Sequence, residues 1–167
     1  MNLTVRTSNP YEIRIERGCL ERAGEEAARI FPAGAKAVVV ADSNVAPLYA
    51  DTVERSLNRA GFGASVLTFP AGETNKRLDA VEAMLSAFAD RGLTRSDFAV
   101  ALGGGVTGDL AGFAAAIYLR GIRFIQIPTS LLAQIDSSVG GKTGADLPEG
   151  KNLVGAFHQP SLVLIDP

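Results

Sequence analysis

The chain has 167 residues, 47% hydrophobic and 20% charged, which is typical of a globular domain with a substantial apolar core. Its 16 Lys and Arg and 18 Asp and Glu give a formal net charge of −2. That balance gives no electrostatic reason to expect a nucleic acid or an anionic membrane as partner. The longest apolar run, residues 110–119, is too short to span a bilayer.

The amino terminus and the cysteine content indicate a cytoplasmic protein. Residues 1–7 lack the basic stretch and apolar block of a secretory signal. The single cysteine, Cys19, excludes an internal disulfide and fits a reducing compartment. We expect Cys19 to be a small packing residue.

The first predicted elements are two strands in a hairpin-like arrangement. Apolar and polar residues alternate over residues 3–7 and again over residues 11–15. Apolar side chains then recur at helical spacing over residues 20–31. Residues 37–41 form an apolar run without polar alternation, which predicts a strand covered on both faces, as in a parallel sheet.

Helices and strands then alternate along the chain. The predicted helices are residues 47–60, 75–91, 108–119 and 130–136, and the predicted strands are residues 65–69, 98–102, 123–127 and 162–165. This order predicts one α/β domain over residues 1–167, with a Rossmann-like, doubly wound, mostly parallel sheet and an N-terminal β-hairpin. Residues 137–159 show no regular pattern, and loops of that length usually carry function or are disordered.

Polar residues and glycines follow the predicted strands where each strand ends. They are residues 42–44, residues 72–73 with Lys76, residues 103–109, and residues 129–130. In an open parallel sheet, ligands bind beyond the carboxyl ends of the strands. One ligand that spans this edge is the simplest explanation.

The glycine cluster at residues 103–109 lies between a predicted strand and a predicted helix. Gly103, Gly105 and Gly108 fit the G-x-G-x-x-G dinucleotide pattern, in which a helix N-terminus receives a pyrophosphate. A tight turn with close helix–strand packing is the alternative. No acidic residue lies about 20 positions further on, so Asp42, upstream, would have to bind the ribose. The site is therefore a dinucleotide site with an unusual chain order, or it is not a dinucleotide site.

Residues 140–143 are similar to a nucleoside-triphosphate loop, but Asp136 stands where that motif requires its first glycine. We reject that interpretation. Lys142, Lys151 and Asn152 could hold phosphate or carboxylate oxygens, or the lysines could be solvated loop residues. His158, the only histidine, cannot form a catalytic zinc site with one distant cysteine, and is expected to be a packed or surface residue.

Several stretches together resemble the 3-dehydroquinate synthase family of the sugar phosphate cyclase superfamily. They are residues 42–44, 70–73 with Lys76, 103–109, 118–121, 128–143 and 150–160. They occur in the family's order, and the block over residues 128–143 is the most specific. The resemblance implies that the chain is the N-terminal NAD-binding domain of such an enzyme.

The family converts 3-deoxy-D-arabino-heptulosonate 7-phosphate, a sugar phosphate, to 3-dehydroquinate and phosphate. This lyase reaction belongs to the shikimate pathway, which leads to chorismate and the aromatic amino acids. Bound NAD⁺ transiently oxidises a ring alcohol, and a metal, zinc or cobalt, polarises that alcohol. The resemblance therefore implies NAD and a metal as cofactors of the full-length enzyme.

The resemblance also implies residue roles. The residues expected to bind NAD are Asp42, Asn44, Glu73, Lys76, Gly104, Gly105, Val106, Asp109, Thr129, Ser130, Leu132, Lys142 and Lys151. The residues expected at the reacting centre are Asp136, Lys142, Asn152 and Arg120. Arg120 is expected to reach the substrate phosphate of a neighbouring subunit, which makes a homodimer part of the site.

In the family, one Glu and two His of a helical C-terminal domain hold the metal. This sequence ends at Asp166 and Pro167, where that domain is expected to begin. We therefore expect the chain to fold, to supply no metal ligands and to show no turnover alone. The alternatives are a sister sugar phosphate cyclase, acting on sedoheptulose 7-phosphate or glucose 6-phosphate, and a stand-alone nucleotide-binding module.

Overall fold

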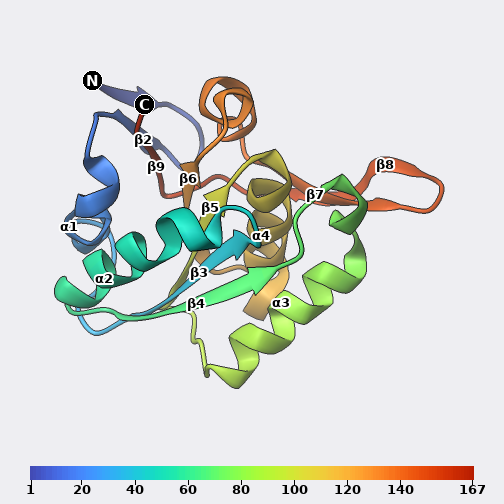
Figure 1. The fold of residues 1–167 in the computed structure, drawn as a ribbon, viewed down its shortest axis with the longest axis horizontal. Helices are drawn as coiled ribbons and strands as arrows, with labels where there is room; N and C mark the ends of the chain where they lie inside the picture. Colours follow the sequence, from blue (N-terminus) through green and yellow to red (C-terminus); the bar gives the residue numbers. More distant parts are fainter.

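A seven-stranded, mostly parallel sheet forms the centre of the molecule (Figure 1), and the computed structural model describes residues 1–167. The strand order is β1-β2-β9-β6-β5-β3-β4. The strands are β1 Asn2–Val5, β2 Tyr11–Ile15, β3 Lys36–Asp42, β4 Gly63–Phe69, β5 Phe98–Gly103, β6 Arg123–Pro128 and β9 Leu162–Ile165. Within this sheet only β1 and β2 pair antiparallel, so the predicted hairpin and parallel sheet are both confirmed.

Helices cover both faces of this sheet. They are α1 Ala23–Ala28, α2 Asp51–Arg59, α3 Leu78–Asp90 and α4 Gly105–Ile117. Short turns of 3-10 or π helix are η1 Cys19–Arg22, η2 Ala46–Ala50, η3 Glu73–Asn75, η4 Tyr118–Arg120 and η5 Ala133–Ser137. None of the helices has the length and apolar character that a bilayer crossing requires.

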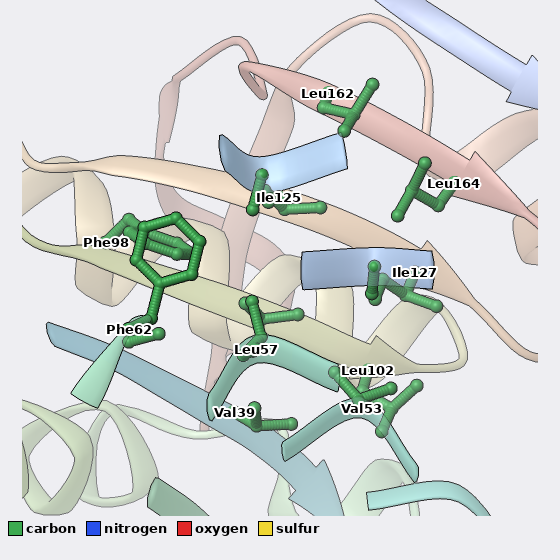
Figure 2. Packing of buried hydrophobic residues seen from close by; sticks show 14 of the residues in the cluster. Val39, Val53, Leu57, Phe62, Phe98, Leu102, Ile125, Ile127, Leu162 and Leu164 are labelled. Atoms are coloured by element: carbon green, nitrogen blue, oxygen red, sulfur yellow. The ribbon is translucent and has the colours of Figure 1, made fainter. Parts of the chain in front are cut away.

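The apolar run in β3 shows why the sheet is doubly covered. Val39 packs into the cluster beneath α1 and α2, whereas Val38 and Val40 pack into the cluster beneath α3 and α4. Successive side chains of a strand point to opposite faces, so a run without polar alternation needs apolar cover on both sides. Figure 2 shows the first cluster, where Val53 and Leu57 of α2 meet the strand side chains.

Several helix boundaries differ from the prediction, and two of them have a clear local cause. The segment predicted as one helix over residues 20–31 divides into η1 and α1. Helix α4 begins at Gly105, before the predicted start at Gly108, because Gly104 is extended and takes the N-cap position. Glycine has a low helix propensity, which concealed this start in the sequence.

The absence of regular structure over residues 137–159 was a wrong expectation. Lys142–Leu147 (β7) and Gly150–Phe157 (β8) form an antiparallel hairpin, which projects from the body beside α4 (Figure 1). Gly144 faces Gly155 across the pair. A Cβ at Gly155 would overlap the carbonyl oxygen of Thr143. Glycines therefore stand where a strand pattern would show β-branched residues.

Helix α4 holds the hairpin against the body through Gly112. A Cβ at Gly112 would lie 2.6 Å from Cγ2 of Thr143 in β7 and 3.2 Å from the Phe124 ring in β6. Thr143 cannot rotate freely, since its hydroxyl donates to the carbonyl oxygen of Ala156 at 2.8 Å. The close approach of α4 and β7 thus requires glycine.

We predict that Gly112→Ala lowers the free energy of unfolding by about 2 kcal/mol, because it overpacks this contact. Urea denaturation measures the change. Gly63→Ala is the matched control, since a Cβ there meets only Cγ of Lys36 at 3.7 Å. Equal stability of the two variants would contradict the packing described here.

Candidate functional site

A cleft of about 440 Å³ lies between the first turns of α4, η5 and the β7–β8 hairpin. The lining residues are Asp109, Asp136, Ser137, Lys142, Thr143, Gly144, Asn152, Val154, Gly155, Ala156 and Phe157. Asp109, Asp136, Lys142 and Asn152 are among the residues that the sequence singled out. The structure therefore brings together side chains from α4, η5, β7 and β8.

The buried ammonium group of Lys76 stands behind this wall. The Lys76 side chain is 6% exposed, and Nζ lies 2.6 Å from Oδ2 of Asp109. Nζ also donates to Oδ1 of Asn152 at 2.5 Å. Lys76 itself does not line the cleft.

Burial raises the pKa of the Asp109 carboxyl group above its ordinary value. The ammonium groups of Lys76 and Lys142 oppose this shift, whereas the carboxylate of Glu73 adds to it. Asp109 is therefore a carboxylate whose charge depends on the cations around it.

The N-terminus of α4 borders the same region. No side chain caps it, and Gly104, Gly105 and Val106 are only partly buried. A Cβ at Gly104 would lie 3.4 Å from Oγ of Ser130, and one at Gly105 would lie 3.1 Å from Oγ of Ser137. Uncapped N–H groups with the positive end of the helix dipole suit an anion such as a pyrophosphate.

The two interpretations of the glycine cluster concern different glycines. Gly103 and Gly108 are buried packing glycines: a Cβ at Gly103 would overlap Thr107, and one at Gly108 would lie 2.8 Å from Oε1 of Gln126. Gly104 and Gly105 instead leave the helix N-terminus open. These two are the glycines that fit close approach of a phosphate.

Asp42 lies at the carboxyl end of β3 and is tied to α4. Its Oδ1 accepts from the backbone N–H groups of Asn44 at 2.9 Å and Val45 at 3.1 Å. Its Oδ2 accepts from the hydroxyl of Thr107 at 3.2 Å. A carboxylate has about four lone-pair sites, so Asp42 retains capacity for one further donor, as a ribose hydroxyl would supply.

Other residues from the sequence prediction lie on the rim or away from the cleft. Lys151 and Glu73 form an exposed ion pair at 3.1 Å. Thr129, Ser130 and Leu132 follow β6 outside the lining set, and the Leu132 side chain is 71% exposed. These residues are near the predicted edge of the sheet, but they do not line the cleft.

Arg120 does not reach the cleft of its own chain. It lies in η4, beyond the C-terminal end of α4, whereas Asp109 lies in the first turns of that helix. The 13 residues of α4 correspond to a length of about 20 Å. Arg120 also has a left-handed backbone conformation, with φ of 67°. Its predicted role in a neighbouring subunit stays a prediction.

The structure settles three further interpretations of the sequence, for His158, Cys19 and residues 142–143. Nε2 of His158 lies 2.8 Å from the carbonyl oxygen of Ile122, and its ring stacks on Phe124, so it is a packed residue. Cys19 is buried in the core beneath α1 and α2, and burial raises its pKa to about 11. Residues 142–143 open β7 rather than a helix, which confirms the rejection of a triphosphate loop.

Sequence reasoning missed Asp146 and Thr107. Oδ1 of Asp146 accepts from the backbone N–H of Asn152 at 2.7 Å, which supports the left-handed conformation of Asn152 at φ 56°. Asn tolerates that conformation better than most residues, so an Asp and an Asn flanking Gly150 could have indicated a hairpin tip. No group of three or more His, Cys, Asp or Glu side chains suited to a metal ion is brought together.

Residues 66–167, more than half of the chain, match the model of the 3-dehydroquinate synthase N-terminal domain. The chain belongs to this family. A 3-dehydroquinate synthase of Streptococcus pneumoniae (strain ATCC 700669 / Spain 23F-1) is 54% identical over 159 residues, which cover 95% of this chain and 44% of the relative. The chain thus spans less than half the length of the curated relatives it matches.

Solved structures of sugar phosphate cyclases have the same fold. A 2-deoxy-scyllo-inosose synthase complexed with carbaglucose-6-phosphate, NAD⁺ and Co²⁺ matches with a TM-score of 0.90 and 28% identity, over 99% of this chain and 45% of that one. ValA, a 2-epi-5-epi-valiolone synthase from Streptomyces hygroscopicus with NAD⁺ and Zn²⁺ bound, matches with a TM-score of 0.84 and 30% identity, over the same shares of each chain. An iron-containing alcohol dehydrogenase, at 20% identity and a TM-score of 0.75, shares the fold alone.

We predict that Thr107 and Asp42 are energetically coupled, because the buried Thr107 hydroxyl donates to a carboxylate. A double-mutant cycle with Thr107→Val and Asp42→Ala, measured by urea denaturation, should give a coupling free energy of about 1 kcal/mol. Strict additivity of the two single changes would show that this contact does not orient Asp42.

Proposed function

We propose that this chain is the NAD-binding part of a 3-dehydroquinate synthase, which converts 3-deoxy-D-arabino-heptulosonate 7-phosphate to 3-dehydroquinate and phosphate. The observation that carries the proposal is the convergence of Asp109, Asp136, Lys142 and Asn152 on one cleft beside the uncapped N-terminus of α4. The proposed substrate follows from the higher identity to a 3-dehydroquinate synthase, 54%, than to the two sister cyclases, 28% and 30%.

NAD⁺, when bound, supplies a hydride acceptor that returns the hydride later in the same turnover. The N-H groups at Gly104 and Gly105 bind its pyrophosphate, since the helix N-terminus offers donors and a positive potential without a Cβ in the way. Asp42 and Asp109 accept hydrogen bonds from ribose hydroxyls. Asn44, Glu73, Val106, Thr129, Ser130, Leu132 and Lys151 are the further residues proposed to border the cofactor.

Substrate oxygens are bound at the hairpin side of the cleft. The exposed ammonium group of Lys142 attracts a phosphate or carboxylate, and the carboxamide of Asn152 donates to a hydroxyl or carboxylate oxygen. Asp136 lines the cleft from η5, where it accepts a hydrogen bond from a substrate hydroxyl or the nicotinamide. These contacts orient the reacting carbon toward the cofactor.

The metal of the proposed enzyme does not fit this chain alone. The chain supplies no group of three His, Cys, Asp or Glu side chains, and a catalytic zinc ion requires three protein ligands. No step of the reaction is therefore assigned to a metal held by these residues. Arg120, at the far end of α4, is proposed to serve the substrate phosphate of a second subunit.

We predict that the chain binds NAD⁺ weakly, with a dissociation constant of about 0.1–1 mM, because this chain forms only part of the expected cleft wall. Isothermal calorimetry measures the affinity. Lys142→Met should weaken binding about fivefold by removing a cation from the lining of the cleft that the anionic cofactor is proposed to enter. Arg55→Met, which removes an exposed charge on α2, is the control. Equal effects of both substitutions would contradict a cofactor site at this cleft.

A chimera tests the enzymatic assignment. Residues 1–167 replace the matching part of the Streptococcus pneumoniae relative, and phosphate release is measured with NAD⁺ and Zn²⁺. We predict turnover of 3-deoxy-D-arabino-heptulosonate 7-phosphate but not of sedoheptulose 7-phosphate or glucose 6-phosphate, and no turnover by the chain alone.

The outcomes of the chimera assay separate the alternatives. Turnover of one of the other two sugar phosphates would favour a sister cyclase. A folded chimera that binds NAD⁺ but turns over none of them would favour a stand-alone nucleotide-binding module. Full activity of a monomeric chimera would remove the role proposed for Arg120 in a second subunit.

A further inference from the structure

Lys76 is bound on two sides by residues of the cleft wall. Its Nζ contacts Oδ2 of Asp109, in α4, at 2.6 Å and Oδ1 of Asn152, in β8, at 2.5 Å. The Lys76 side chain is nearly completely buried, and it is absent from the cleft lining that its two partners share. The ammonium group therefore faces protein rather than the space that a ligand would enter.

The main chain of Lys76 forms a second connection to the hairpin. Its carbonyl oxygen accepts from the backbone N–H of Asp146 at 2.7 Å, and Arg77 and Asp146 form a parallel bridge. Asp146 in turn accepts from the backbone N–H of Asn152. The segment after β4 is thus joined to the hairpin tip through both the side chain and the backbone of one residue.

We propose that Lys76 is a positioning residue, whose buried ammonium group holds the Asp109 carboxylate and the Asn152 carboxamide at the cleft wall without contacting the dinucleotide. This inference rests on the proposed function and refines it, because the family resemblance implied a direct contact between Lys76 and NAD. A buried cation needs a paired anion and further hydrogen bonds. Asp109 and Asn152 supply both.

The pKa of Asp109 provides a way to measure the positioning role of Lys76. The charged groups that face its carboxylate are Lys76 from the segment after β4, Glu73 from η3 and Lys142 from β7. Lys76 makes the direct ion pair, so its removal leaves a buried carboxylate with weaker cationic support. The Asp109 pKa must then rise further, and the protonated carboxyl is a poorer acceptor for ribose hydroxyls.

The test uses Lys76→Met in the 167-residue chain. Carbon-13 NMR of the Asp109 carboxyl, without ligand, should show a pKa above that of the unsubstituted chain. NAD⁺ affinity should fall about tenfold at neutral pH and recover as the pH rises through the new Asp109 pKa. Arg55→Met, which removes an exposed cation paired with Asp51 on α2, should leave the Asp109 pKa in place.

A direct contact between Lys76 and NAD⁺ predicts a different result: the affinity stays low at every pH, including pH values at which Asp109 of the substituted chain is ionised. That result overturns the inference. Absence of NAD⁺ binding by the unsubstituted chain would instead count against the proposed function, while the ligand-free NMR titration still tests the positioning role.

If Lys76→Met does not fold, a measurement on the unsubstituted chain tests the positioning role of Lys76. Nitrogen-15 NMR of the Lys76 ammonium group should show slow proton exchange and a chemical shift that follows the Asp109 titration. The Lys151 ammonium group is the matched reference, since it is 70% exposed. Exchange at Lys76 as fast as at Lys151, with no response to Asp109, would overturn the inference.

Discussion

A buried ammonium group constrains the arrangement of the whole candidate site. Lys76 loses most of its hydration on folding, so its charge must be compensated by the protein. The Asp109 carboxylate and the Asn152 carboxamide provide that compensation from α4 and β8. Because the two partners come from different elements, their shared contact with Lys76 joins the hairpin to α4 and to the segment after β4. The position of the hairpin against α4 in turn places the residues that line the cleft.

Glycines serve two opposite purposes around the same helix. At Gly103, Gly108 and Gly112 the missing Cβ lets α4 approach the sheet and β7. At Gly104 and Gly105 the missing Cβ leaves the helix N-terminus uncapped and partly open. A helix packed this closely cannot shift without steric overlap, so its open N-terminus is held in a fixed place relative to Asp42, which Thr107 ties to the same turn.

The sequence predicted the sheet because each strand had a local signal, such as the apolar run at Val38, Val39 and Val40. It also predicted Asp109 and Lys142 as site residues, from a glycine cluster and a family resemblance. It did not predict the β7–β8 hairpin, whose glycines Gly144 and Gly155 carry no strand preference. Nor could it predict that Lys76 is buried, because burial of a lysine depends on partners from distant segments.

The charge of the cleft indicates what must complete it. The charged groups of its lining are Asp109, Asp136 and Lys142, and the ion pair of Asp109 with Lys76 leaves one carboxylate, Asp136, and one ammonium group, Lys142, unmatched. A sugar phosphate and a dinucleotide are both anionic, so their joint binding here would place like charges close together without further cations. The open helix N-terminus can offset part of the pyrophosphate charge. In the proposed enzyme, further compensation for a substrate phosphate would come from groups outside this cleft, and that requirement is the physical reason to propose Arg120 of a second subunit as part of the site.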